Sequence, residues 1–354
     1  MDLRFPATSA ILRSVAQLDH FRGTWASGTL LPPDRLSRMR EAAHIQSISA
    51  ACRMAGIRIS DAEVASILAG QEVGVREASE ILGYSEALNR AFPKGPLLTT
   101  EEIRRLHAVV MGGGEGTCEP SPWRDVPYHL EAFDSDGKAI GRVFQTLPPR
   151  LVPESLESLV AWLEIGLAAS ENHPLMLIGA FVLGFFAASP FLNGNVRMSC
   201  LLAGHLLRRA GYDYVHYASL EREFEERREA FYDNFDASST KLWSGEADLA
   251  PWLAFFLECL AHHSERVAAK IGLERRVLEF SPLQRVIVET VREHGTAAAS
   301  LLLTATGTNR NTLKDNLRRL VRRGVLEQMG RRRGTLYRLA TGEPTVKAVA
   351  EKLV

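Results

Sequence analysis

A run of fifteen apolar residues most constrains what this chain can fold into. Residues 174–188 read PLMLIGAFVLGFFAA and contain no charged or strongly polar side chain. Crossing a bilayer takes about 20 such residues, so a helix of this composition must be buried on every side within a globular protein. Ser189-Pro190 ends the helix, because proline cannot continue it and disfavours helical backbone at the preceding residue. We therefore expect a central buried helix around which other elements pack.

The residues that follow this helix predict an anion-binding turn. Asn193-Gly194-Asn195 leads into a second predicted helix, over residues 196–210. Backbone amides at a helix start are unpaired and lie at the positive end of the macrodipole, where a phosphate group binds well. The predicted anion-binding residues are Asn193, Gly194, Asn195 and Arg197. A simple turn without a ligand is the alternative.

The stretch SPFLNGNVRMSC, residues 189–200, resembles the core motif of Fic-domain proteins, HPFxDGNGRxxR. Proteins of that family transfer AMP or another phosphate-containing group to protein hydroxyls. This chain keeps Pro190, Phe191, Gly194, Asn195 and Arg197. The resemblance extends over residues 42–271, so it implies a Fic-type helical core and a nucleotide such as ATP, with Mg, as the ligand.

The chain departs from this motif where the family's chemistry lies. Ser189 stands at the position of the base histidine and Asn193 at that of the magnesium-binding acid, while Val196 and Cys200 replace the second glycine and the second arginine. A serine hydroxyl is too weak a base to take a proton from a target hydroxyl near neutral pH. An amide oxygen is also a poorer magnesium ligand than a carboxylate. We therefore assign no catalytic residue and no metal ligand with certainty, and His173 and His205 are expected to be structural.

The N-terminal part of the chain resembles the inhibitory region of Fic proteins, in degenerate form. In such proteins a Ser/Thr-xxx-Glu-Gly motif supplies a glutamate that pairs with the second arginine of the core motif. Here Gly56 is in place, but Ala55 stands at the position of the glutamate and Cys200 at that of the arginine. Losing one partner of a buried ion pair costs about 3–5 kcal/mol, whereas losing both is nearly neutral.

A β-hairpin is predicted between the N-terminal helices and the buried run. Residues 126–132 and 139–144 alternate apolar and polar side chains, and the sequence DSDG at 134–137 supplies the turn. In Fic proteins a hairpin at this place, the flap, pairs with the main chain of the target protein. The resemblance therefore implies Trp123, Arg124 and Val126 as target-binding residues. A solvated hairpin without a partner is the alternative.

Residues 281–340 predict a separate basic module. Residues 309–338 hold ten Lys and Arg against two acidic residues, although the whole chain has 42 of each kind. Such asymmetry between parts of a chain suggests a separate basic module. Three predicted helices and then a strand, a basic turn and a strand follow the order of a winged helix-turn-helix, which ends many bacterial Fic proteins.

Two sets of side chains in this module would contact duplex DNA. The third helix would present Arg310, Asn311, Lys314 and Arg318 to the major groove. The turn between the strands would present Arg331, Arg332 and Arg333 to phosphates. The alternatives are a solvated basic face and a dimerisation module that binds no DNA.

The predicted fold class is mostly α, with a Fic-type helical core, a β-hairpin flap and a C-terminal winged helix-turn-helix. The predicted domains are residues 1–95 (N-terminal helices with the degenerate inhibitory segment), 96–275 (Fic), 281–340 (winged helix) and 341–354 (tail).

The N-terminus lacks the basic-then-apolar order of a signal peptide, and the four cysteines have no disulfide or metal-binding spacing. We therefore expect a cytoplasmic protein without membrane contact, and the resemblance to bacterial Fic proteins that end in a winged helix implies a bacterial one.

Three functions are compatible with this sequence. The first is a pseudoenzyme, a nucleotide- or protein-binding scaffold coupled to a DNA-binding winged helix. The second is a protein adenylyltransferase, or a related transferase, whose base comes from elsewhere, and the third is a protein-interaction scaffold that uses the flap. Four substitutions in one motif favour the first function over the second, and the basic module favours it over the third. A homodimer remains open.

Overall fold

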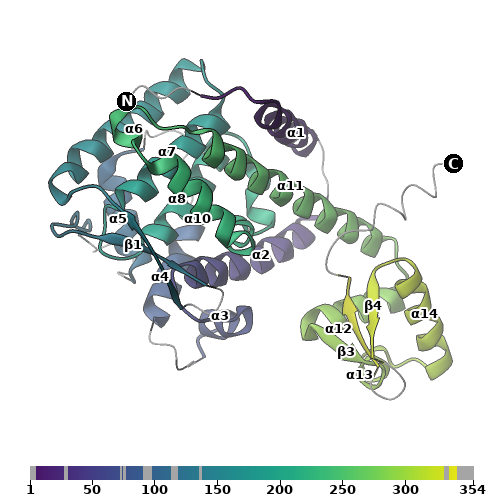
Figure 1. Cartoon of the computed structure of the whole chain (residues 1–354). Coiled ribbons are helices and arrows are strands. Elements are labelled where there is room, and N and C mark those ends of the chain that lie inside the picture. Colours follow the sequence, from purple (N-terminus) through teal and green to yellow (C-terminus); the bar gives the residue numbers. More distant parts are fainter. Residues whose placement is uncertain are drawn as a thin grey trace. The chain divides into compact units, whose positions relative to one another are not determined.

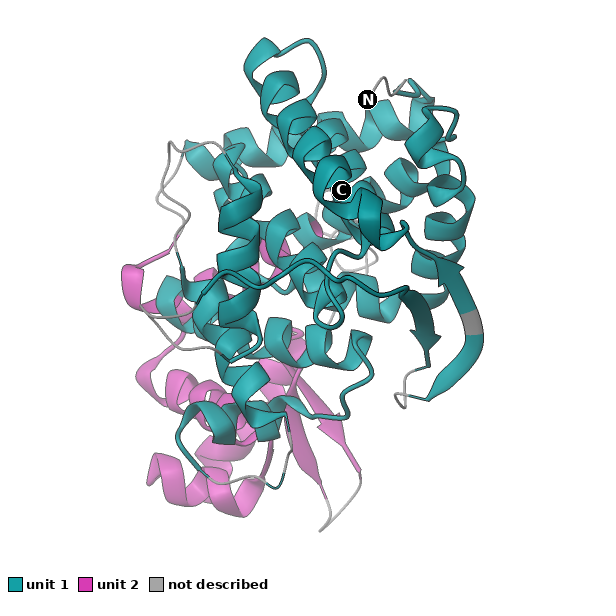
Figure 2. Ribbon diagram, turned by 90° about the vertical axis from the view of Figure 1, so that its left-hand side faces the viewer, with its two compact units in different colours: residues 1–28, 36–264 teal, residues 29–35, 265–354 magenta. Residues whose placement is uncertain are grey.

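The chain, described here from a computed structural model, divides into two compact units (Figure 1, Figure 2). Unit 1 comprises residues 1–28 and 36–264, and unit 2 comprises residues 29–35 and 265–354. The structure describes residues 5–27, 31–71, 74, 77–90, 98–112, 119–134, 138–330 and 335–340. The predicted mostly helical fold with a hairpin is confirmed.

Most helices belong to unit 1. They are α1 (Ser9–Ala26), α3 (Asp61–Leu68), α4 (Ala78–Asn89), α5 (Thr100–Val110), α6 (Val152–Ala169), α7 (Pro174–Ala188), α8 (Asn195–Arg209), α9 (Leu220–Glu226) and α10 (Arg228–Ser239). Short 3-10 helices are η1 (Pro149–Leu151), η2 (Asp213–Tyr217) and η3 (Leu242–Ser244). Two helices have residues in both units: α2 (Pro33–Met54) begins in unit 2, and α11 (Ala250–Leu278) ends there.

Helix α7 is the centre of unit 1, as the sequence predicts. Every residue from Leu175 to Ala188 is buried. Gly179 and Gly184 leave room for neighbouring side chains, since a Cβ at Gly179 would lie 2.8 Å from Leu253 Cδ2. The indole Nε1 of Trp252 donates a hydrogen bond of 2.8 Å to Gly179 O. The predicted bounds of this helix are the observed ones.

The predicted hairpin consists of β1 (His129–Phe133) and β2 (Ala139–Gln145), which pair antiparallel. The predicted first strand began three residues earlier, at Val126. Those residues lie outside the sheet because side chains bind their carbonyls: Arg124 Nη1 donates to Val126 O at 3.0 Å, and Thr146 Oγ1 donates to Tyr128 O at 2.5 Å. The register shifts between Glu131 and Phe133.

Unit 2 contains α12 (Pro282–His294), β3 (Thr296–Ala298), α13 (Ala299–Thr306), α14 (Arg310–Arg322), β4 (Leu326–Met329) and β5 (Leu336–Leu339). The strands form one antiparallel sheet in the order β3-β5-β4. The three helices and the last two strands follow the predicted order, whereas β3 was not predicted.

The core of unit 2 also uses residues ahead of position 281. Val277 and Phe280 are buried in the same apolar cluster as the side chains of α12 and α14. Glu274, at the end of α11, pairs with Arg292 of α12 and lies 3.4 Å from the Nη1 of Arg35. The C-terminal part of unit 2 therefore begins at residue 265 and not at 281. Residues 29–35, which include the start of α2, also belong to this unit.

In the described part of the chain, none of the helices combines the length and the apolar composition that a membrane span requires.

Candidate functional site

The turn between α7 and α8 places Ser189 at the end of the buried helix. Ser189 is 0% exposed and has a left-handed backbone, with φ of 41°. Its hydroxyl donates a hydrogen bond of 2.7 Å to Phe186 O, and its amide donates one of 3.0 Å to Phe185 O. The side chain at the position of the family's base thus completes the C-terminus of α7.

Asn195 holds the turn together from inside. Its Oδ1 accepts a hydrogen bond from Phe191 N at 3.1 Å, and its Nδ2 donates one to Phe191 O at 2.7 Å. The side chain is buried, so its amide is committed to the turn itself. The side chain of Asn195 thus braces the turn, and the predicted contact of Asn195 with an anion stays a prediction.

Gly194 caps the start of α8 with φ of 75°. A Cβ at this position would lie 3.1 Å from Met111 Sδ and 3.2 Å from His107 Nε2. The left-handed backbone and this close approach both require glycine. Met111 and His107, at the end of α5, therefore flank the amides that the sequence predicted as an anion site.

Arg197 lies in the first turn of α8 and is 2% exposed. One nitrogen, Nη2, pairs with Glu80 of α4 and lies 3.6 Å from Met111 Sδ. Its other nitrogens, Nε and Nη1, have no hydrogen-bond partner among the described residues. Buried donors without acceptors are costly, and they are rare in proteins unless water or a ligand completes the site. Arg197 thus retains two donors without an acceptor, and both are buried.

His107, like Glu80, belongs to this site although the sequence did not predict it. Its ring stacks on Phe191 with centroids 3.6 Å apart. Nε2 lies 3.0 Å from Asn193 O and Nδ1 lies 2.7 Å from Ser121 Oγ. Because a carbonyl only accepts, Nε2 carries the proton and Nδ1 accepts from Ser121.

This bonding also limits what His107 can do. Burial lowers the pKa of its imidazole to about 4, so the ring is neutral at neutral pH. Both ring nitrogens already have partners inside the protein, so no lone pair remains to take a proton from a substrate. His107 therefore supports the turn and does not replace the missing base.

The donor set at the turn does not fit a magnesium ion. Asn193 is exposed and offers one neutral amide oxygen, and its backbone oxygen is bonded to His107. Within the described residues, no three His, Cys, Asp or Glu side chains gather into a group that could hold a metal. Hard cations prefer several oxygen ligands, with carboxylates among them.

The two histidines expected to be structural lie away from the turn, because His173 is at the opposite end of α7 and His205 is in the middle of α8. His173 caps α7, with Nδ1 accepting from Leu175 N at 3.3 Å and Nε2 lying 3.0 Å from Asp19 Oδ2. His205, in the middle of α8, is buried, and this burial lowers its pKa to about 3.

The predicted target-binding residues of the hairpin divide into two kinds. Arg124 is 3% exposed and donates hydrogen bonds to Ser189 O at 2.7 Å and Ala188 O at 3.2 Å. It therefore ties the base of the hairpin to the end of α7 and is not available to a target. Trp123 packs 5.2 Å from the ring of Phe191, and Val126 is 47% exposed.

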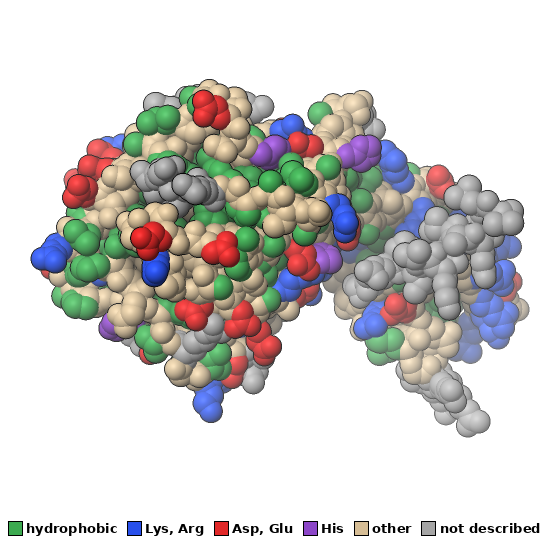
Figure 3. All heavy atoms as spheres, turned by 45° about the horizontal axis from the view of Figure 1, so that its top comes forward, with side chains coloured by type: hydrophobic (Ala, Val, Ile, Leu, Met, Phe, Trp, Pro, Cys, Tyr) green, Lys and Arg blue, Asp and Glu red, His purple; other side chains and the backbone are tan. Residues whose placement is uncertain are grey.

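In unit 2, α14 separates an apolar face from a basic one. The residues on its buried face are Leu313, Leu317 and Leu320, and those on its exposed face are Arg310, Asn311, Lys314 and Arg318. Figure 3 shows Lys and Arg side chains gathered on the surface of this unit. The remaining predicted DNA contacts, Arg331, Arg332 and Arg333, lie outside the described residues.

Comparisons with known proteins agree with this architecture. Residues 97–207 match the model of the Fic/DOC family. The chain is 25% identical over 235 residues to "Protein adenylyltransferase Fic" of Culex quinquefasciatus, a match that covers 63% of this chain and 41% of that protein. The chain thus spans about two-fifths of the length of this curated relative.

Solved structures of Fic proteins share the fold. A Fic family protein from Desulfovibrio desulfuricans G20 has a TM-score of 0.64 at 20% identity and covers 98% of this chain and 100% of its own. A Fic domain-containing signaling protein from Bacteroides thetaiotaomicron VPI-5482 has a TM-score of 0.58 at 18% identity, covering 75% and 97%. Fic-1 from C. elegans has a TM-score of 0.57 at 18% identity, covering 75% and 73%. The family match and the shared fold together show that this chain carries a Fic/DOC family domain.

Proposed function

We propose that this protein is a DNA-binding regulator whose Fic domain binds a phosphate-containing ligand and no longer transfers AMP. The observation that carries the loss of transfer is the bonding of Ser189. Its hydroxyl is buried and donates into α7, so it has neither the basicity nor the access that a general base needs. His107, with both nitrogens bonded, offers no substitute.

Labelling of protein by α-³²P-ATP tests the loss of transfer. General-base catalysis contributes roughly 10²–10⁴-fold, so we expect the purified full-length protein to label neither itself nor lysate proteins above the level of an Arg197→Met variant. Incorporation that disappears in Arg197→Met would instead support the alternative of a transferase with altered catalytic residues.

The two unpartnered nitrogens of Arg197 support ligand binding at the start of α8. A phosphate group, as in ATP or another nucleotide, would supply the acceptors that these donors lack. Glu80 already takes one nitrogen of the same guanidinium, so the ligand and this carboxylate would share or compete for Arg197.

Thermal unfolding in inorganic triphosphate, with ionic strength held constant by chloride, tests this part. We expect triphosphate to raise the unfolding temperature of the wild-type protein and to raise that of Glu80→Gln by more. The unfolding temperature of Arg197→Met should not change. Glu86→Gln, which loses only a surface pair with Arg90 on the same helix, is the matched control and should behave as wild type. An equal shift in Arg197→Met would place the bound anion elsewhere.

The exposed basic face of α14 supports duplex DNA as the partner of unit 2. Its side chains are long, cationic or amide-bearing and lie on one face of a thirteen-residue helix. Such a helix fits a major groove, where arginine and asparagine read base edges and lysine contacts phosphates. Binding of a duplex by the full-length protein, followed against salt concentration, tests this assignment.

A further inference from the structure

The end of α2 lies directly against the hairpin β1–β2. This is the segment that resembles a degenerate inhibitory motif, with Ala55 in place of its glutamate. Gly56 has φ of 84°, and a Cβ there would lie 3.2 Å from two ring atoms of Phe133. The absence of a side chain at Gly56 thus lets the chain after α2 approach the end of β1.

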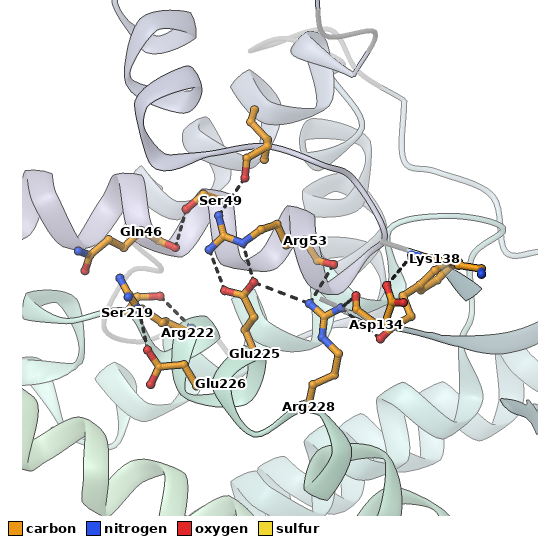
Figure 4. A network of polar contacts seen from close by, with 12 residues as sticks. Gln46, Ser49, Arg53, Asp134, Lys138, Ser219, Arg222, Glu225, Glu226 and Arg228 are labelled. Atoms are coloured by element: carbon orange, nitrogen blue, oxygen red, sulfur yellow. Dashed lines mark hydrogen bonds and ion pairs between the residues drawn. The ribbon is translucent and has the colours of Figure 1, made fainter. Parts of the chain in front are cut away.

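One arginine joins these two segments (Figure 4). Arg228, at the start of α10, donates through Nη1 to Phe133 O at 3.1 Å and also to Asp134 O. Its Nη2 donates to Arg53 O, at the C-terminal end of α2, at 3.2 Å. The side chain of Arg228 is only 8% exposed, so water competes little for these hydrogen bonds. A single guanidinium therefore bridges the end of a helix and the end of a strand.

The ion pair between Glu225 and Arg53 holds Arg228 in place. Glu225 lies 3.7 Å from Arg228 Nη2 and accepts two hydrogen bonds from Arg53, from Nε at 2.5 Å and from Nη2 at 2.7 Å. These bonds raise the pKa of the Arg53 guanidinium. Arg53 in turn donates to Ile59 O at 2.9 Å, which fixes it to the loop before α3.

The inner face of the hairpin is packed, since Leu130, Ala132 and Phe144 are buried, whereas the opposite face of β2 has little packing. The hairpin has only two strands, and an isolated two-stranded hairpin is at best marginally stable in water. Ile140 and Val143 of β2 are 51% and 50% exposed, so much of their apolar surface is not packed. At the end of β1, the amide of Phe133 donates to Tyr232 Oη at 3.4 Å, and its carbonyl accepts from Arg228.

We propose that Arg228, oriented by Glu225 and Arg53, is the positioning residue of the hairpin, and that the end of α2 is the hairpin's seat. The segment without the inhibitory glutamate has in this chain a different task, that of fixing β1. Because both polar backbone groups of Phe133 are bonded to α10, a partner strand that adds to β1 must end before this residue. This inference holds whether or not the chain binds DNA or a nucleotide.

Hydrogen–deuterium exchange on the full-length protein tests the proposal. In Arg228→Gln we expect the amides of β1 and β2 to exchange at least about tenfold faster, since bonds to a charged donor are lost. The amides of α7 should exchange as in wild type. The matched control is Arg222→Gln, which removes an exposed arginine that pairs with Glu226 nearby and should leave hairpin exchange unchanged.

Two results would overturn the proposal. Hairpin exchange in Arg228→Gln that equals wild type would show that the network does not hold the hairpin. Acceleration by the same factor in the hairpin and in α7 would reveal a general loss of stability instead of a local release.

A second variant, Arg53→Met, should accelerate hairpin exchange less than Arg228→Gln does. The double variant should match Arg228→Gln, because residues that act as one unit are not additive.

Discussion

At the scale of single residues, the site is defined by contacts that join distant parts of the sequence. The sequence revealed Gly194 and Arg197 because they belong to a compact pattern of turn and helix start. Glu80 and His107 carry no such local signal, since their importance comes from Arg197 and Asn193, which lie 117 and 86 positions further along the chain. Local patterns thus predicted the turn but not the side chains that close around it.

Stability should depend on the protonation of the buried histidines. His107 and His205 have folded-state pKa values of about 4 and about 3, lowered mainly by burial, against a reference of 6.5. Below pH 6.5 the unfolded chain therefore binds more protons than the folded one. The contribution of these two histidines to the free energy of unfolding is fully present above pH 6.5 and is lost as the pH drops toward 4. Each histidine contributes a loss of about 1.4 kcal/mol per pH unit.

Urea unfolding between pH 7.5 and 5 measures this dependence. The variant His107→Gln, which keeps a polar side chain without a titrating group, should lose stability less steeply with falling pH than the wild type. Parallel curves for the two proteins would mean that His107 is protonated equally in the folded and unfolded states.

At the scale of elements, the sequence predicts correctly those segments whose own residues determine their structure. Helix α7 follows from its apolar run and the proline after it, and α8 was predicted within one residue at each end. Strand β3 was missed because its three residues show no alternation and become a strand by pairing with β5, some 40 positions later. The hairpin is predicted correctly, but it begins at His129 and not at Val126, whose carbonyl accepts a hydrogen bond from Arg124.

Two glycines of the α8 region should respond to alanine with opposite signs. Gly194→Ala forces a left-handed backbone on alanine and moves its Cβ toward Met111, so we expect a loss of about 1–2 kcal/mol. Gly204 lies within α8 with nothing within 4 Å of a Cβ, so Gly204→Ala should gain about 0.5–1 kcal/mol. Urea unfolding compares the two variants, and a tolerated Gly194→Ala would refute the tight geometry described for the turn.

At the scale of the whole molecule, the structural units differ from the domains that the sequence suggested. The predicted module begins at Ser281-Pro282, which is the capped start of α12. A capping box marks where a helix begins, which is not the same as where a compact unit begins. Val277 and Glu274 belong to the core and ion pairs of unit 2, so a fragment starting at residue 281 would lack both. DNA binding should accordingly be measured on the full chain.

The most direct test of the central claim is the salt dependence of duplex binding by the full-length protein. Each phosphate neutralised contributes about −0.9 to the slope of log affinity against log salt. We predict a steep slope for the wild type, and a weaker affinity with a flatter slope for the triple variant Arg310→Ala, Lys314→Ala, Arg318→Ala. Arg105→Ala, which removes an exposed arginine of α5, should bind as wild type. A triple variant that binds with wild-type affinity and slope would contradict the account.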